Sequence, residues 1–110
     1  MNSHKLDRMI GMAMRAGRLD IGEGRVQERI RRGQSRLVIL AGDAGENTGK
    51  KFKNMCRYRS LPLISIGDRA VLGQWIGRPF VVVISVSDAG FAEQILALYA
   101  EACGHAERND

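Results

Sequence analysis

The sequence predicts an α/β fold, a three-layer α/β/α sandwich around a small mixed, largely parallel sheet. Two observations lead to this class. Segments with helical periodicity alternate along the chain with short apolar runs of strand length. These runs lack the alternation of apolar and polar residues that marks a sheet with one wet face. Both faces of the sheet are therefore expected to be covered by helices.

The first half of the chain is expected to hold three helices and two strands. Over residues 4–16, apolar side chains recur at i, i+3 and i+4, with Ser3 as the N-cap and Gly17 just past the end. The remaining predictions for this half are an edge strand at 19–21, a helix at 25–32 ended by Gly33, a strand at 36–41 and a helix at 48–59.

The second half is expected to hold two strands and two helices. Pro62 ends the preceding helix, a buried strand follows at 63–66, and Asp68 caps a short helix that runs to Ile76. A turn at 77–79 leads into the most apolar strand, 80–86, and Asp88 caps the last helix. We expect one domain over residues 1–104 and a polar tail over 105–110, since no repeat or linker divides the chain.

Positive charge is concentrated in the N-terminal half. The 110 residues carry 17 Lys and Arg against 12 Asp and Glu, a net charge of +5. Residues 1–60 alone have a balance of +8, and 13 of the 17 cations are arginine. A concentrated positive field attracts polyanions, and the planar guanidinium suits phosphate and guanine edges. Charge therefore favours a nucleic-acid partner over a merely soluble basic surface.

Catalysis, cofactors and metals are not expected. His4 and His105 lie near the termini, and Asp43, Asp68 and Asp88 are explained as helix caps. Cys56 and Cys103 form no CxxC pair and lie on apolar helix faces, as inert free thiols of a reducing compartment do. No apolar run is long enough to cross a bilayer and no signal peptide is visible, so we expect a cytoplasmic monomer without a membrane partner.

One segment resembles a phosphate-binding loop. The stretch AGENTGKK has Gly49 and Lys50 in place, but Ala44 occupies the first glycine position and Lys51 the position of the magnesium-binding hydroxyl. Without that hydroxyl and the first glycine, nucleotide hydrolysis is disfavoured. Lys50 and Lys51 are interpreted as surface cations near the start of a helix.

The most informative stretch is the basic helix with a glycine entry. Val26 and Ile30 face the core, so the positions i, i+4 and i+7 on the exposed face hold Arg25, Arg29 and Arg32, with Glu28 beside them. Gly22, Glu23 and Gly24 lead into this helix, where glycines permit close approach and open amides attract anions. The segment is interpreted as a phosphate-reading edge, against the alternative of a solvated helix face.

A second basic cluster and two aromatic residues are ambiguous. The cluster comprises Lys50, Lys51, Lys53, Arg57 and Arg59. Tyr58 and Trp75 could stack on bases, but packing in a partly buried position is the favoured interpretation of both. Few aromatic residues and the strands between the helices disfavour an aromatic RNA-binding sheet and a helix-turn-helix. Single-stranded or bent RNA, contacted through the glycine entry, fits better.

Four stretches resemble the bacterial YlxQ-type branch of the ribosomal protein L-seven-Ae superfamily, whose members bind kink-turn RNA. They are MIGMAMRAGRLDIGEG, RLVILAGDAGENTGKK, LGQWIG and VVVISVSDAGFA, and they keep their order over most of the chain. The resemblance implies an α/β/α sandwich, no catalysis, and work with structured RNA or the ribosome. It also implies two RNA-contacting segments, the helix entry that begins at Gly22 and the loop Ile76, Gly77, Arg78 and Pro79.

The helix entry departs from the pattern Gly-X-Asn-Glu-X-X-Lys of kink-turn binders. Gly24 stands at the asparagine position, Arg25 at the glutamate position and Glu28 at the lysine position. Gly24 has no side chain with which to read a base, and Arg25 can only donate hydrogen bonds. Glu28 repels phosphate unless a neighbouring arginine screens it.

Two functional hypotheses follow. The first is a non-enzymatic, ribosome- or translation-associated RNA-binding protein that places Gly22–Arg32 and the loop at 76–79 on structured RNA, with a kink-turn as one candidate. The second is a protein-interaction module of a transcription or translation assembly in which the RNA site has been lost. The departures at the helix entry, the acidic second half and the long amphipathic last helix motivate the second.

Overall fold

A computed structural model describes residues 3–103 of the chain, with side chains over residues 5–102. The elements are, in order, α1 (Ser3–Arg15), β1 (Leu19–Ile21), α2 (Glu23–Arg31), β2 (Leu37–Ala41), α3 (Glu46–Tyr58), β3 (Leu63–Ile66), α4 (Arg69–Ile76), β4 (Val83–Val86) and α5 (Ala89–Cys103). Every helix and strand expected from the sequence is present. The capping side chain of Ser3, the side chains of His4 and Cys103, and the predicted tail at 105–110 lie outside the described residues.

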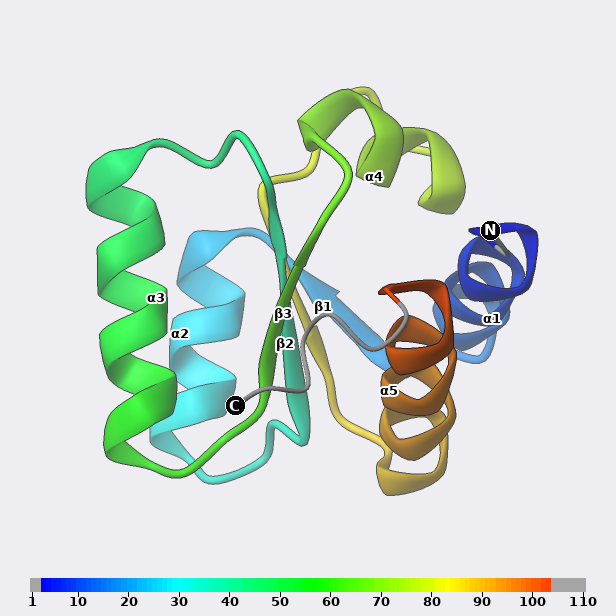
Figure 1. Cartoon of the computed structure of the whole chain (residues 1–110). Coiled ribbons are helices and arrows are strands. Elements are labelled where there is room, and N and C mark those ends of the chain that lie inside the picture. Colours follow the sequence, from blue (N-terminus) through cyan, green and yellow to red (C-terminus); the bar gives the residue numbers. More distant parts are fainter. Residues whose placement is uncertain (1–2, 104–110) are drawn as a thin grey trace.

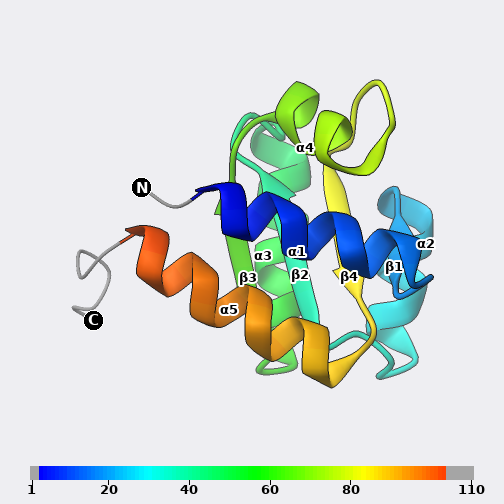
Figure 2. The ribbon, with the colours of Figure 1, turned by 90° about the vertical axis from the view of Figure 1, so that its right-hand side faces the viewer.

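The elements form three layers, as predicted. Figure 1 shows α2 and α3 side by side on one face of the sheet, α1 and α5 on the other, and α4 across one end of the strands. In Figure 2, which looks onto the second face, α1 and α5 lie next to each other in front of the strands. Both sheet faces are thus covered, which explains the uninterrupted apolar character of the strands.

The sheet is mixed, with the strand order β1-β4-β2-β3. Only the pairing of β2 with β3 is parallel, whereas β4 pairs antiparallel with both β1 and β2, so β4 runs against the other three strands. The predicted mixed sheet is confirmed, and the expectation of parallel neighbours fails at β4, whose two pairings are both antiparallel. Strands that are buried on both faces are apolar whichever way they run, so their composition carries no information about direction.

Successive residues of the central strands point into two separate cores. On β2, Leu37, Ile39 and Ala41 pack toward α1 and α5, while Val38 and Leu40 pack toward α2 and α3. This is the period of two that a strand imposes on its side chains. Ser85 of β4 is fully buried among these groups, and its hydroxyl is satisfied by the hydroxyl of Ser35, 2.7 Å away.

Two predicted boundaries shift for identifiable reasons. The strand predicted over 80–86 begins only at Val83, because Pro79 offers no N–H and the amide of Val81 donates to the carbonyl of Arg69 in α4. Residues 77–82 therefore form a loop beside α4. The basic helix begins at Glu23 rather than Arg25, directly after Gly22.

The predicted aspartate caps are present, although one acts on a different helix. Asp68 accepts a hydrogen bond from the amide of Val71, and Asp88 accepts one from the amide of Phe91. Asp43 precedes α3 but accepts from the amide of Arg69, the first residue of α4. Since the ends of β2 and β3 lie together, the hydrogen bond to Asp43 ties the loop after β2 to the start of α4.

Candidate nucleic-acid interface

The N-terminal tip of α2 is built around a glycine that no other residue replaces easily. Gly22 has φ 102° and ψ 152°, a conformation that a Cβ disfavours, and its amide donates to Val83 of β4. Gly22 has no side chain that could cap the helix, so the first N–H groups of α2 lack the side-chain acceptor that a capping residue provides. A Cβ at Gly24 would meet no atom within 4 Å. The backbone of the tip is therefore open to close approach.

Arg25 and Arg78 meet at this tip although they are far apart in the sequence. Both side chains are exposed, and together they line a cleft of about 140 Å³ with Met14, Leu19 and Ile21. Within residues 5–102, no carboxylate forms an ion pair with either guanidinium. The tip of α2 and the loop at 77–82 therefore present, at one place, two arginines that have no carboxylate partner among the described side chains.

Arg29 is held by neighbouring side chains. Its Nε donates to Oδ2 of Asp20 at 2.8 Å, and a second guanidinium nitrogen donates to Gln34 at 2.8 Å. The Asp20 side chain is only 15% exposed, which places the pair in a partly desolvated position on the edge strand. Arg29 lies on the predicted face of α2, but part of its hydrogen-bonding capacity is used within the protein.

Arg32 and Glu28 form an ion pair one helical turn apart. Nε of Arg32 lies 2.7 Å from Oε2 of Glu28, and this hydrogen bond, together with the positive charge, lowers the pKa of Glu28. The pair screens the carboxylate that occupies the lysine position of the family pattern. Arg25, Glu28, Arg29 and Arg32 line one groove of about 300 Å³ with Asp20 and Gln34, so the predicted common face is confirmed.

Glu23 brings a carboxylate to the first turn of α2, where it contacts α3. It lies 3.6 Å from Nζ of Lys51 and accepts a hydrogen bond from the Thr48 hydroxyl at 3.3 Å. These contacts partly neutralise a charge that would repel phosphate. Lys50 and Lys51 lie inside α3, which begins at Glu46, so the stretch that resembles a phosphate-binding loop is mostly helical. Both side chains are exposed, which confirms their interpretation as surface cations near the start of a helix.

The residues of the loop after α4 differ in exposure. Ile76, a predicted RNA-contacting residue, is only 7% exposed and belongs to the core, so its side chain is not accessible to a partner as expected from the sequence. Gly77 ends α4 in the left-handed conformation, with φ 76°. Phe80, by contrast, is 68% exposed. The apolar run predicts a strand at this position, although Pro79 directly before it is a signal of a loop.

The two ambiguous aromatic residues differ. Trp75 is partly buried against the core, as expected. Tyr58 at the end of α3 is 86% exposed, so its interpretation as a packing residue was wrong.

In the second basic cluster, Arg59 donates to the carbonyl oxygens of Ile30 at 3.0 Å and Arg31 at 3.4 Å. The cluster thereby reaches the C-terminal end of α2.

The described residues contain little that could support catalysis. Among them, no group of three His, Cys, Asp or Glu side chains is placed to hold a metal ion. Cys56 is buried, and loss of solvation raises the pKa of its thiol from 9.0 to about 11, which disfavours the reactive thiolate. Nor does any helix within residues 3–103 combine the length and apolar character needed to span a membrane.

Known proteins resemble this chain over most of its length. It is 40% identical over 90 residues to the RNA-binding protein YlxQ of Bacillus subtilis, a match that covers 82% of this chain and 90% of that protein. It is 27% identical over 94 residues to the large ribosomal subunit protein eL8 of Thermoplasma volcanium, covering 84% and 78% of the two chains. These names describe RNA-binding and ribosomal proteins, in agreement with the prediction that the chain is not an enzyme.

Solved structures share the fold. A protein of unknown function from Bacillus halodurans superposes with a TM-score of 0.83 at 41% identity, covering 86% of this chain and 95% of that one. A 15.5kD RNA binding protein of Giardia lamblia superposes with a TM-score of 0.73 at 20% identity, covering 93% and 89%, which supports the fold alone. The Ribosomal protein L7Ae/L30e/S12e/Gadd45 family matches residues 4–96. The chain therefore belongs to this family, on its YlxQ-type branch.

Proposed function

We propose that this protein is a non-enzymatic RNA-binding protein of the translation apparatus that contacts structured RNA through the tip of α2 and the loop at 77–80. The observation that carries the proposal is the meeting of Arg25 and Arg78, both exposed and without a carboxylate partner in the described region, beside the open amides of the Gly22 turn. Guanidiniums and helix-start amides are both suited to phosphate.

Each part of this surface has a role in the proposal. The amides at Gly22–Gly24 approach the RNA backbone, while Arg25 and Arg78 contact phosphate or a guanine edge from two sides. Phe80, exposed in the same loop as Arg78, offers an apolar ring for an unstacked base. Arg29 and Arg32 contribute positive potential, although each is hydrogen-bonded to a carboxylate. A kink-turn, which places a sharp bend beside unpaired nucleotides, is the RNA that we propose for the first test.

The names of the relatives support the same class of ligand. The proteins matched at about 40% identity and at 27% identity carry the names of an RNA-binding protein and of a ribosomal protein. The rival hypothesis of a protein-interaction module loses one support, because the apolar stripe of α5 is packed against the core rather than exposed. Among the described residues, the exposed large apolar side chains are Met12, Tyr58 and Phe80, and none of them lies on α5.

The proposal is tested by RNA titration at several salt concentrations. Each phosphate contact contributes about 0.7–0.9 to the slope of log affinity against log salt. If Arg25 and Arg78 each contact phosphate, the Arg25→Ala/Arg78→Ala variant should lower the slope for a kink-turn hairpin by about 1.4–1.8. The matched control is Lys5→Ala/Arg8→Ala, which removes two exposed cations from α1 and should leave most of the slope.

The outcomes separate the two hypotheses. Equal slopes for both double variants would contradict the proposed site. A wild-type protein that binds neither a kink-turn hairpin nor a straight duplex would favour the interaction module instead. Co-purification with ribosomal material that survives ribonuclease would favour it as well.

A further inference from the structure

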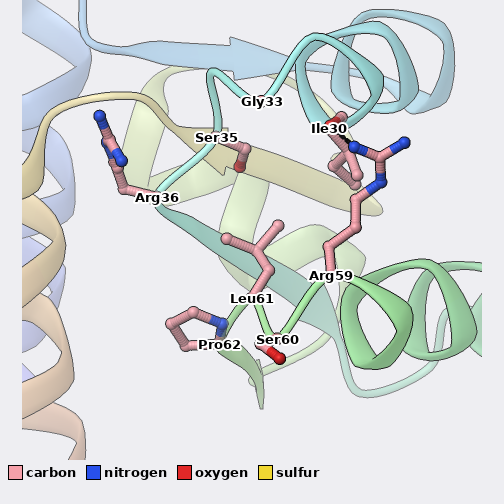
Figure 3. Close-up of a pocket in the computed structure, with 8 residues that line it drawn as sticks. All are labelled: Ile30, Gly33, Ser35, Arg36, Arg59, Ser60, Leu61 and Pro62. Carbon is pink, nitrogen blue, oxygen red and sulfur yellow. Dashed lines mark hydrogen bonds between the residues drawn. The ribbon is translucent and has the colours of Figure 1, made fainter.

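A second polar cleft lies at the opposite end of α2 from the tip. It measures about 530 Å³ and is formed by the end of α2, the turn that enters β2 and the turn between α3 and β3. Figure 3 shows Arg36 on one side of this cleft and Arg59 on the other, with Ser35, Ser60, Leu61 and Pro62 between them. The nine residues of α2 span about 13 Å, so the cleft is spatially separate from the tip.

The charge of this cleft has one sign. None of its lining residues is a carboxylate, whereas the groove along α2 includes Asp20 and Glu28. Arg36 is exposed, and its amide is fixed to the carbonyl of Val86 at 2.7 Å, which anchors its backbone to the sheet. Two more exposed arginines lie in the last turns of the adjoining helices, Arg31 at the end of α2 and Arg57 one residue before the end of α3. The cleft is therefore a focus of positive potential.

Two helices end near this cleft, and their carbonyl ends would oppose an anion. Arg59 offsets this effect at α2, because one of its nitrogens donates to the carbonyls of Ile30 and Arg31. The same bonds fix the direction of its guanidinium, whose other two nitrogens carry three further N–H donors. Arg59 thus both neutralises the helix end and is held in place for an anionic ligand.

An exposed aromatic residue directly precedes Arg59 in the sequence, although it does not itself line the cleft. Tyr58 lies between Arg57 and Arg59 in the sequence, at the last residue of α3, and 86% of its surface is open to solvent. Burial in the core does not explain this side chain. A positively charged groove beside an exposed aromatic ring is the combination by which proteins bind single-stranded nucleic acid, with backbone on the cations and bases on the ring.

We infer that the cleft between Arg36 and Arg59 is a second RNA site, which takes the phosphates of a single-stranded segment while a base stacks on Tyr58. The inference relies on the proposed function for the class of ligand and goes beyond it in location and in the form of the RNA. With both ends of α2 occupied, the domain would hold a folded RNA at the tip and a flanking single strand at the cleft.

The test uses fluorescence anisotropy with a labelled oligouridine of about 12 nucleotides, a length that matches known single-strand sites. We expect Arg36→Glu to weaken binding about tenfold and Tyr58→Ala to weaken it at least about fivefold. The matched control, Arg8→Glu on α1, makes the same change in net charge and should cost less than about threefold. Arg59 is left intact because it supports the end of α2, and circular dichroism checks that each variant is folded.

The inference is overturned if oligouridine does not bind the wild-type protein, or if Arg36→Glu and Arg8→Glu weaken binding equally. If Arg25→Ala/Arg78→Ala loses oligouridine binding while Arg36→Glu and Tyr58→Ala retain it, single strands bind at the tip of α2, and the inference is overturned as well. Its failure is distinguishable from that of the proposed function. The variants of the cleft, Arg36→Glu and Tyr58→Ala, should retain binding of a blunt kink-turn hairpin. The variant of the tip, Arg25→Ala/Arg78→Ala, should retain binding of oligouridine.

Discussion

Arg29 on α2 donates from Nε to Oδ2 of Asp20 on β1 over 2.8 Å, so the middle arginine of the basic helix is fastened to the edge strand. The same guanidinium also reaches Gln34 beyond the end of the helix. The row of arginines on α2 is therefore not uniform. Arg25 at the tip is open, whereas Arg29 and Arg32 are hydrogen-bonded to carboxylates.

Replacing Asp20 should strengthen RNA binding while it weakens the fold slightly. Asp20→Asn removes a negative charge from the groove along α2 and releases Arg29 from its ion pair. We expect about a threefold gain in affinity for RNA at low salt and a loss of about 1 kcal/mol or less in the free energy of unfolding. RNA titration and urea unfolding measure the two effects.

The companion variant for this prediction is Arg29→Ala. Because Asp20 then has no partner to release, the further change Asp20→Asn in that background should increase affinity by less than it does in the wild type. Equal gains in the two backgrounds would mean that Arg29 takes no part in binding.

The pair formed by Arg32 and Glu28 predicts a measurable titration. The hydrogen bond and charge of Arg32 lower the pKa of Glu28 below its ordinary value of 4.5, so the pair stabilises the folded state at neutral pH, and this contribution is lost as pH falls through the lowered pKa. In Arg32→Ala the pKa of Glu28 should rise toward 4.5. Carbon-13 NMR of the side-chain carboxyl of Glu28 measures it, in the wild type and in the variant. An unchanged pKa would mean that the pair does not persist in solution.

Gly73 should matter for the binding loop as well as for stability. A Cβ at this position of α4 would lie 2.8 Å from the carbonyl oxygen of Pro79 and would also press on that of Arg78. We expect Gly73→Ala to cost about 1–3 kcal/mol in the free energy of unfolding and to weaken RNA binding, because the loop that carries Arg78 must move. Chemical unfolding and RNA titration measure the two effects.

Gly42→Ala is the matched control for the loop. A Cβ there would approach the carbonyl oxygen of Gly67 to 2.6 Å, a comparable clash with backbone at a different loop. It should lower stability and leave RNA affinity nearly unchanged. If both alanine variants reduce affinity alike, the effect comes from general destabilisation and not from the position of Arg78.

Cys56 should be chemically inert in the folded protein. Its side chain is 2% exposed, and burial raises the pKa of the thiol to about 11. Between pH 9 and 11 the unfolded state releases a proton that the folded state keeps, so this thiol makes the protein less stable as pH rises through that range. Alkylation followed by mass spectrometry of the peptide that carries Cys56 should show modification only under denaturing conditions. Rapid modification of the native protein would contradict the buried placement.

Local patterns determined the order and type of every element of this fold. Helical periodicity, capping aspartates and short apolar runs are properties of residues that are close in the sequence. They favour the same helix or strand whichever other element the segment later packs against. The same reasoning placed Arg25, Glu28, Arg29 and Arg32 on one face of one helix, because the helix itself sets that spacing. The resemblance to the family likewise rested on stretches that can be recognised without coordinates.

Only the tertiary structure decided the direction of β4, the partners of the arginines and the residues of the loop after α4. Strand direction depends on how β4 returns between β1 and β2, and apolar composition is the same for either direction. Asp20 reaches Arg29 only because β1 lies against α2, and Arg78 lines the same cleft as Arg25 only because the loop after α4 lies at that edge. Charge–charge contacts and loop placement join residues that are distant in the sequence, so they follow from the packing of whole elements.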